Sequence, residues 1–167
     1  MTIDISDLLK KKSGEKKIDL IIEASDFKSD EFIKFNKPVH LSGILNLLGD
    51  IINFDGIIRT ELELVCSRCN ENFNQNIDIP IVEKFSNKEK DINVFDDIIY
   101  FNGDNIDITD VIQNNIIMTL PIKMLCMEDC KGLCQNCGTN LNFHSCNCSK
   151  DTIDPRLSKL KDLFSAN

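Results

Sequence analysis

Apolar and polar residues alternate along the middle of the chain with the two-residue period of a β-strand. From Ile58 to Cys66 the even positions are apolar apart from one threonine, and three of the four odd positions between them are charged. Successive side chains of a strand point to opposite faces of its sheet. Residues 51–66 are therefore expected to form a strand with one buried face and one wet face.

Three neighbouring segments are also rich in Ile, Val and Leu, which favours further strands. Turn-forming residues separate the segments at Asp50 and at residues 70–74. The pattern predicts an antiparallel sheet with meander topology. The three segments are residues 17–24, 38–48 and 72–85.

Apolar residues at three- and four-residue steps predict helices at other places. Residues 107–120 have this spacing, with Thr109 placed to cap the start and Pro121 following the end. This helix is expected to cover the sheet. Residues 3–12 suit a short amphipathic helix or an extended arm, and residues 154–164 suit a short closing helix.

The formal net charge of −8 disfavours a broad nucleic-acid-binding surface and suits a basic partner, while a local basic patch is still compatible with it. Residues 1–17 lack the apolar stretch of a secretion signal, and the apolar runs elsewhere are too short to cross a membrane. We therefore expect a cytoplasmic protein with no membrane partner, in which cysteines stay reduced.

All eight cysteines fall in close pairs, which indicates metal binding in a reducing compartment. Cys134 and Cys137 flank two residues and precede Gly138, whose freedom to take a positive φ suits a knuckle around a metal ion. Cys146 and Cys148 lie on one side of an extended segment and complete a four-thiolate site. Zinc is the expected ion.

A second site is predicted from two cysteine pairs that lie far apart in the sequence, so their spacing does not by itself bring them together. Cys66 and Cys69 form another knuckle where a strand ends, and Cys126 and Cys130 share one face of a helical turn. These four are expected to hold a second ion, although one zinc with spare thiols and other partitions of the cysteines remain open. An iron–sulfur cluster is chemically compatible, but nothing else in the sequence suggests electron transfer. His144 is expected to face solvent.

These observations predict an α+β fold: an antiparallel sheet or meander covered by one or two helices, followed by a C-terminal cysteine-rich zinc-binding module. The expected domains are residues 1–120, β-rich with an acidic, flexible connection at 87–97 before a short strand at 98–101, and residues 121–167, the zinc module with its terminal helix. Metal binding would supply folding free energy to this small, polar module.

No catalytic residue set is visible. The sequence has no phosphate-cradling GxxxxGK[ST] motif, no dinucleotide-binding GxGxxG motif, and no recognisable nucleophilic triad. Thiolates bound to a metal are also withdrawn from ordinary nucleophilic chemistry. We therefore expect a protein that is not an enzyme.

The cysteine segments resemble a known family. The Cys66-Ser67-Arg68-Cys69 knuckle, the Leu120-Pro121 helix end, the run from Cys126 to Asn142 and the Asp154-Pro155-Arg156 segment are together similar to the YceD family of large ribosomal RNA subunit accumulation proteins. The resemblance implies a cytoplasmic role in synthesis, processing or stability of large-subunit (23S) ribosomal RNA. It carries no catalytic site.

The leading hypothesis is a binding factor for ribosome assembly. Its expected partners are large-subunit ribosomal RNA or its precursor, and a basic ribosomal protein or assembly factor. Arg68, Lys131 and Arg156 are the candidate contact residues, and zinc knuckles reading RNA directly are an alternative mechanism. The competing hypothesis is a thiol-based zinc or redox sensor, or a metal-handling protein.

Overall fold

The computed structural model describes residues 1–11, 14–29, 31–87 and 98–148. By its backbone contacts the chain divides into two compact units. The β unit comprises Met1–Ser67 and Glu71–Cys126, and the cysteine unit comprises Arg68–Asn70 and Met127–Asn167. Residues 88–97 of the predicted connection at 87–97, and the predicted helix at 154–164, lie outside the described residues.

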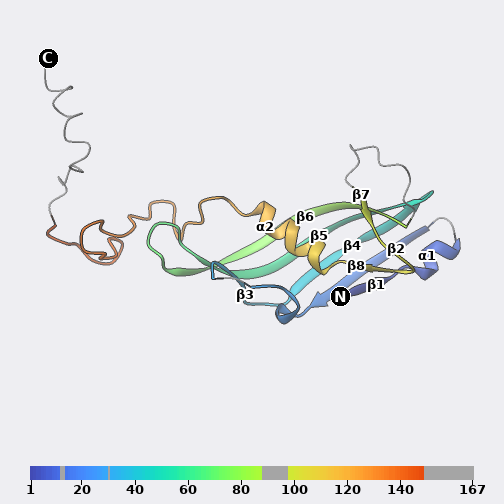
Figure 1. Cartoon of the computed structure of the whole chain (residues 1–167), viewed down its shortest axis with the longest axis horizontal. Helices are drawn as coiled ribbons and strands as arrows, with labels where there is room; N and C mark the ends of the chain where they lie inside the picture. Colours follow the sequence, from blue (N-terminus) through green and yellow to red (C-terminus); the bar gives the residue numbers. More distant parts are fainter. Residues whose placement is uncertain (12–13, 30, 88–97, 149–167) are drawn as a thin grey trace, which may run out of the picture. The chain divides into compact units, whose positions relative to one another are not determined.

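A sheet with strand order β2-β4-β5-β6-β7 forms the body of the β unit (Figure 1). The three pairs among β2, β4, β5 and β6 are antiparallel, as the meander prediction requires, whereas β7 is parallel to β6. A further short strand, β3, pairs antiparallel with residues 62–64 near the C-terminal end of β5. The strands are β2 Gly14–Ile22, β3 Ile33–Phe35, β4 Val39–Leu48, β5 Ile51–Val65, β6 Asn72–Ser86 and β7 Ile98–Tyr100.

The predicted alternation along β5 is confirmed. Ile58, Leu62 and Leu64 are buried, whereas Arg59 on the opposite face is exposed and forms an ion pair with Asp78 of β6 at 3.1 Å. Register keeps the faces aligned, because directly paired residues of neighbouring strands share a face. The apolar core therefore lies on one side of the sheet.

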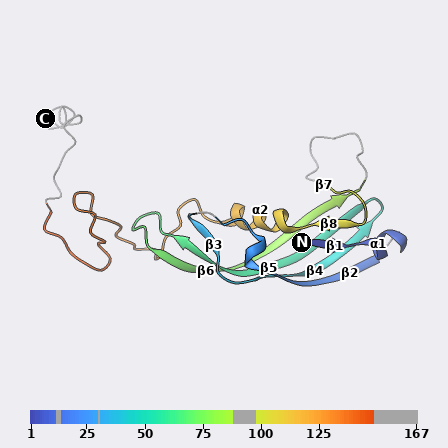
Figure 2. The same ribbon diagram turned by 60° about the horizontal axis from the view of Figure 1, so that its bottom comes forward.

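Helix α2 (Thr109–Thr119) lies across the buried side of the sheet (Figures 1 and 2). Its side chains Ile112 and Ile116 belong to the same core cluster as the inward residues of the strands. The helix ends before Pro121, as predicted, because proline disfavours helical conformation in the residue before it. This observation confirms the expected α+β character, in which β-structure predominates.

The N-terminal segment combines a strand and a helix. Strand β1 (Thr2–Asp4) pairs antiparallel with β8 (Asn105–Asp107), and helix α1 (Ser6–Lys11) follows. A short 3-10 turn, η1, spans Ala24–Asp26. The helix predicted for 3–12 is thus shorter than expected, because its first residues are taken up by pairing with β8.

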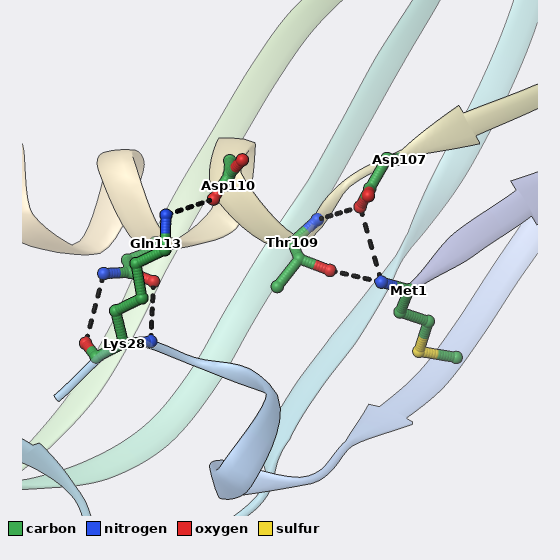
Figure 3. A network of polar contacts seen from close by, with 6 residues as sticks. All are labelled: Met1, Lys28, Asp107, Thr109, Asp110 and Gln113. Carbon is green, nitrogen blue, oxygen red and sulfur yellow. Dashed lines mark hydrogen bonds and ion pairs between the residues drawn. The ribbon is translucent and has the colours of Figure 1, made fainter.

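The prediction that Thr109 caps α2 is wrong. Asp107 accepts the Thr109 backbone N–H at 3.0 Å, and this hydrogen bond lowers the pKa of the Asp107 carboxyl (Figure 3). The Thr109 hydroxyl instead accepts from the amino group of Met1, which also pairs with Asp107 at 3.4 Å. The N-cap position is Ile108, which makes no side-chain cap hydrogen bond, and the carboxylate of Asp107, one residue earlier, ties the start of α2 to β1.

A second set of contacts holds the first two turns of α2. The Gln113 amide bonds both the N–H and the carbonyl of Lys28, at 3.0 and 3.1 Å, and the Lys28 ammonium reaches Asp110 at 3.7 Å (Figure 3). These groups fix the helix against the chain that follows η1.

No helix among the described residues is long and apolar enough to span a membrane.

The β4–β5 pairing depends on two glycines that face each other. Gly43 is paired with Gly56, and the Phe54 ring lies over both. A Cβ added at Gly56 would lie 2.6 Å from the Ser42 carbonyl oxygen and 2.8 Å from the Phe54 ring. Because this carbonyl belongs to the backbone of the paired strand β4, it cannot move away from an added Cβ without disturbing the pairing of β4 with β5.

We expect Gly56→Ala to lower the free energy of unfolding by about 1–3 kcal/mol, as overpacking a core does. Urea unfolding followed by circular dichroism measures the change. Asp55→Ala, on the exposed neighbouring position, is the control and should change the free energy by no more than about 0.5 kcal/mol. Equal unfolding midpoints for the two variants would show that the glycine pair is not required.

Candidate metal centres

The cysteine unit contains a complete four-sulfur group. The Sγ atoms of Cys134, Cys137, Cys146 and Cys148 all lie within 4.8 Å of one another. Sulfurs bound tetrahedrally at about 2.3 Å from one ion are roughly 3.8 Å apart. The four thiols therefore fit a single tetrahedral metal ion, and they are the set expected from the spacing.

A tight backbone turn positions the first two sulfurs of this group. The Gly138 N–H donates to the Cys134 carbonyl at 2.9 Å, and the Cys134 N–H donates to the Thr139 carbonyl at 2.8 Å. Gly138 has a φ of 73°, as predicted, which a glycine adopts without steric cost. Leu133 and Asn140 form a β-bridge across the base of this knuckle.

Crowding gives these thiols unequal acidities. The Thr139 hydroxyl, 3.2 Å from the sulfur, and the Thr139 N–H lower the pKa of Cys137 to about 6. The hydrogen bond to Cys137 and the negative charge there raise the pKa of Cys148 to about 12. Without a cation the four sulfurs therefore do not all ionise at neutral pH. A bound metal removes this conflict, because coordination stabilises every thiolate.

The second four-sulfur group is more buried. The Sγ atoms of Cys66, Cys69, Cys126 and Cys130 also lie within 4.8 Å of one another. Cys66, Cys69 and Cys130 are 1–3% exposed, whereas Cys137 of the other group is exposed. The two groups together contain all eight cysteines. Both could hold a metal ion.

Backbone hydrogen bonds within the β unit position two cysteines of the second group, Cys66 and Cys126. In the β unit, the Cys66 N–H donates to the Glu71 carbonyl at 2.9 Å, and the Ser67 N–H donates to the Met124 carbonyl at 2.8 Å. The latter bond joins the residue that follows Cys66 to the segment that leads to Cys126. It explains how two cysteines far apart in the sequence come together.

Arg68 makes a structural contact within the cysteine unit. Its Nη1 donates to the Cys130 carbonyl at 2.8 Å, in a partly buried position. Gly132 packs against it: a Cβ there would lie 3.0 Å from the Arg68 carbonyl oxygen. The guanidinium therefore holds the chain that carries Cys130, a role that the sequence analysis did not foresee.

Asn142 is a further site residue that sequence reasoning missed. Its Nδ2 donates to the Cys130 sulfur at 3.3 Å, and its Oδ1 accepts the Lys131 N–H at 2.7 Å. Amide hydrogen bonds to a sulfur are typical of groups that orient metal-binding thiolates. No pattern in the sequence points to Asn142, because an asparagine in a polar segment rich in asparagine is not distinguished from its neighbours.

The other candidate residues lie as follows. Lys131 is exposed in the cysteine unit, and Arg156 lies outside the described residues. His144 is exposed, as expected, and belongs to neither sulfur group. His40 in the β unit contacts Asp19 at 2.6 Å. No histidine is therefore needed to complete either group of four.

Comparison with known proteins finds relatives that match the part of the chain containing both sulfur groups. A family model for the large ribosomal RNA subunit accumulation protein YceD matches residues 54–164. The "Uncharacterized protein YlbN" of Bacillus subtilis (strain 168) is 27% identical over 151 residues, which cover 83% of this chain and 88% of YlbN. No solved structure matches.

Two plant proteins are also similar. Each carries the name "Large ribosomal RNA subunit accumulation protein YCED homolog 1, chloroplastic". The Arabidopsis thaliana protein is 28% identical over 141 residues and the Zea mays protein 29% over 144 residues, covering 67% and 68% of this chain. This alignment spans 44% and 49% of the plant proteins, so the chain matches about half of their length.

The family match covers most of the chain and takes in all eight cysteines, together with the Arg68 and Asn142 contacts that support them. On this evidence the chain belongs to the YceD family of large ribosomal RNA subunit accumulation proteins.

Proposed function

We propose that this protein is a non-enzymatic factor that supports the synthesis, processing or stability of large-subunit (23S) ribosomal RNA in the cytoplasm. The observation that carries the proposal is the family match over residues 54–164, together with plant relatives named for large ribosomal RNA subunit accumulation. The protein acts by binding, during assembly of the large subunit.

Zinc in both sulfur groups fits this role. A tetrahedron of four protein thiolates leaves no open position for water or substrate, which is the arrangement of structural zinc sites. The ions would hold the chain in shape and take no part in chemistry. The contact surface is then built from the residues around the knuckles.

Formal charge differs strongly between the two units. The cysteine unit has six basic and five acidic residues, a net charge of +1, and the β unit has 13 basic and 22 acidic residues, a net charge of −9. The β unit therefore repels phosphate and suits a basic ribosomal protein or assembly factor. RNA contacts belong on the cysteine unit, where Lys131 and Arg156 are the candidates.

Depletion of the protein in its own cells tests the proposed function. We expect the ratio of large- to small-subunit ribosomal RNA to fall, and expression of the wild-type chain to restore it. RNA electrophoresis measures the ratio, and ribosome profiles on sucrose gradients show the missing subunit. An unchanged ratio after complete depletion would exclude this function.

We expect the purified chain to carry two zinc ions, because each sulfur group fits one ion. Mass spectrometry for metals should count one ion in Cys134→Ser and one in Cys66→Ser. A chelator should remove the ion of the exposed group before that of the buried group, so the fast phase is absent in Cys134→Ser. Equal single-phase loss from both variants would contradict this assignment.

The same measurement separates zinc from the alternatives. Iron with visible absorbance would indicate an iron–sulfur cluster, and rapid loss of zinc under mild oxidant would favour a thiol sensor over a structural role.

Substitutions of Arg68 and Lys131 should differ in their effect on the stability of the protein. Arg68→Ala leaves the Cys130 carbonyl without its charged donor, so we expect the free energy of unfolding to fall by about 1–3 kcal/mol. Lys131→Ala removes an exposed ammonium and should leave stability and metal content unchanged. Chemical unfolding and metal analysis measure both. If Arg68→Ala is as stable and as metal-loaded as Lys131→Ala, the guanidinium contact is not structural.

A further inference from the structure

A hollow of about 580 Å³ lies beside the exposed sulfur group of the cysteine unit. Three of that group's cysteines form part of its wall, so the metal-binding knuckle shapes it. Its volume is in the range of small-ligand sites. The residues that line it besides the cysteines include Lys131, Leu133, Gln135, Leu141, His144 and Ser145.

The lining combines two apolar surfaces with exposed polar groups. Leu133 and Leu141 supply aliphatic contact, and Gln135 offers both an amide donor and an amide acceptor. The His144 ring and the Ser145 hydroxyl add further donors and acceptors. A nucleobase has matching chemistry, because its faces are apolar and its edge carries donors and acceptors side by side.

Charge around the hollow favours a base over a phosphate. In the described part of the cysteine unit, Arg68 and Lys131 are balanced by Glu128 and Asp129. Four thiolates around a divalent ion add a net charge of about −2. Lys131 is the one cation among the residues lining the hollow. A single ammonium can pair with one phosphate, but it cannot neutralise the row of phosphates along a duplex backbone.

We propose that this hollow binds one unpaired base of an RNA strand, with Gln135 and His144 contacting the base and Lys131 contacting the adjoining phosphate. The inference rests on the proposed function and names the form of RNA that the protein recognises. Bases paired in an A-form helix present their edges in grooves that a pocket of this kind cannot enclose, whereas bases in loops can be splayed out and bound.

Phe143 gives independent support. Its side chain is 68% exposed, and it directly precedes His144 in the chain. Phe143 is not among the residues that line the hollow, but an exposed phenyl ring one residue before the lining residue His144 offers a face on which a neighbouring unpaired base can stack. Phe143→Ala should therefore weaken binding of single strands without altering the pocket itself.

The test uses the full, zinc-loaded chain and a short fluorescent RNA of mixed sequence, presented as a single strand and as a duplex. Fluorescence anisotropy should show preference for the single strand. We expect Gln135→Ala/His144→Ala to weaken that binding about tenfold, since stacking and edge contacts to one base are lost. The matched control is Gln75→Ala/His40→Ala in the β unit, which should bind as the wild-type chain does.

Metal content is measured for every variant, and ultraviolet crosslinking of the wild-type chain locates bound RNA without any substitution. Crosslinks within residues 131–148 support the proposal even if a variant loses its metal. Equal affinities of the two double variants, crosslinks confined to the β unit, or absence of single-strand binding would overturn it. If depletion lowers large-subunit RNA while no RNA binds, the proposed function stands through a protein partner and the base pocket falls.

Discussion

The convergence of four sulfur atoms is the constraint on which the cysteine unit depends. Among its described residues, only Cys69, Cys130 and Gly132 are buried, and Leu133 and Phe143 are exposed. Burial of apolar surface therefore supplies too little free energy to order this part of the chain. Coordination of a metal ion can supply it, because binding to a site that forms only on folding adds directly to the folding free energy.

The β unit is held together in a different way. Its long strands pair in register from β2 to β6, and their inward side chains form one continuous core with α2. Close approach of the backbones at Gly43 and Gly56 lets Phe54 fold over the pair. This unit therefore has its own source of stability, and it contains Cys66 and Cys126.

The separation of charge connects these two kinds of architecture to function. Acidic residues are concentrated in the unit that folds around an apolar core, and basic residues nearly balance acidic ones in the unit built around sulfur. Bound zinc, as proposed, would leave each group of four thiolates with net negative charge, and the cysteine unit would then be a poor general phosphate binder. Recognition of exposed bases suits it better, since stacking and hydrogen bonds to a base edge require little net charge.

Much of the β unit follows from the sequence, because the two-residue alternation of β5 and the aliphatic runs beside it are local signals. The short strands β1, β3 and β8 were missed, since three residues are too few to show a period, whereas the equally short β7 was expected at residues 98–101. The sequence also failed to place the start of α2: the N-cap is Ile108, and Asp107, which lies in β8 where it pairs with β1, accepts the Thr109 N–H.

For the site, the sequence determined the knuckle of Cys134 and Cys137 with its glycine turn, since a metal-binding turn is specified by residues a few positions apart. Tertiary structure decided that Cys66 and Cys69 meet Cys126 and Cys130, and that Arg68 and Asn142 support Cys130. It also decided that a hollow opens beside the exposed group. Such contacts form between segments that are far apart in the sequence, and the spacing of residues within one segment does not predict which other segment it will contact.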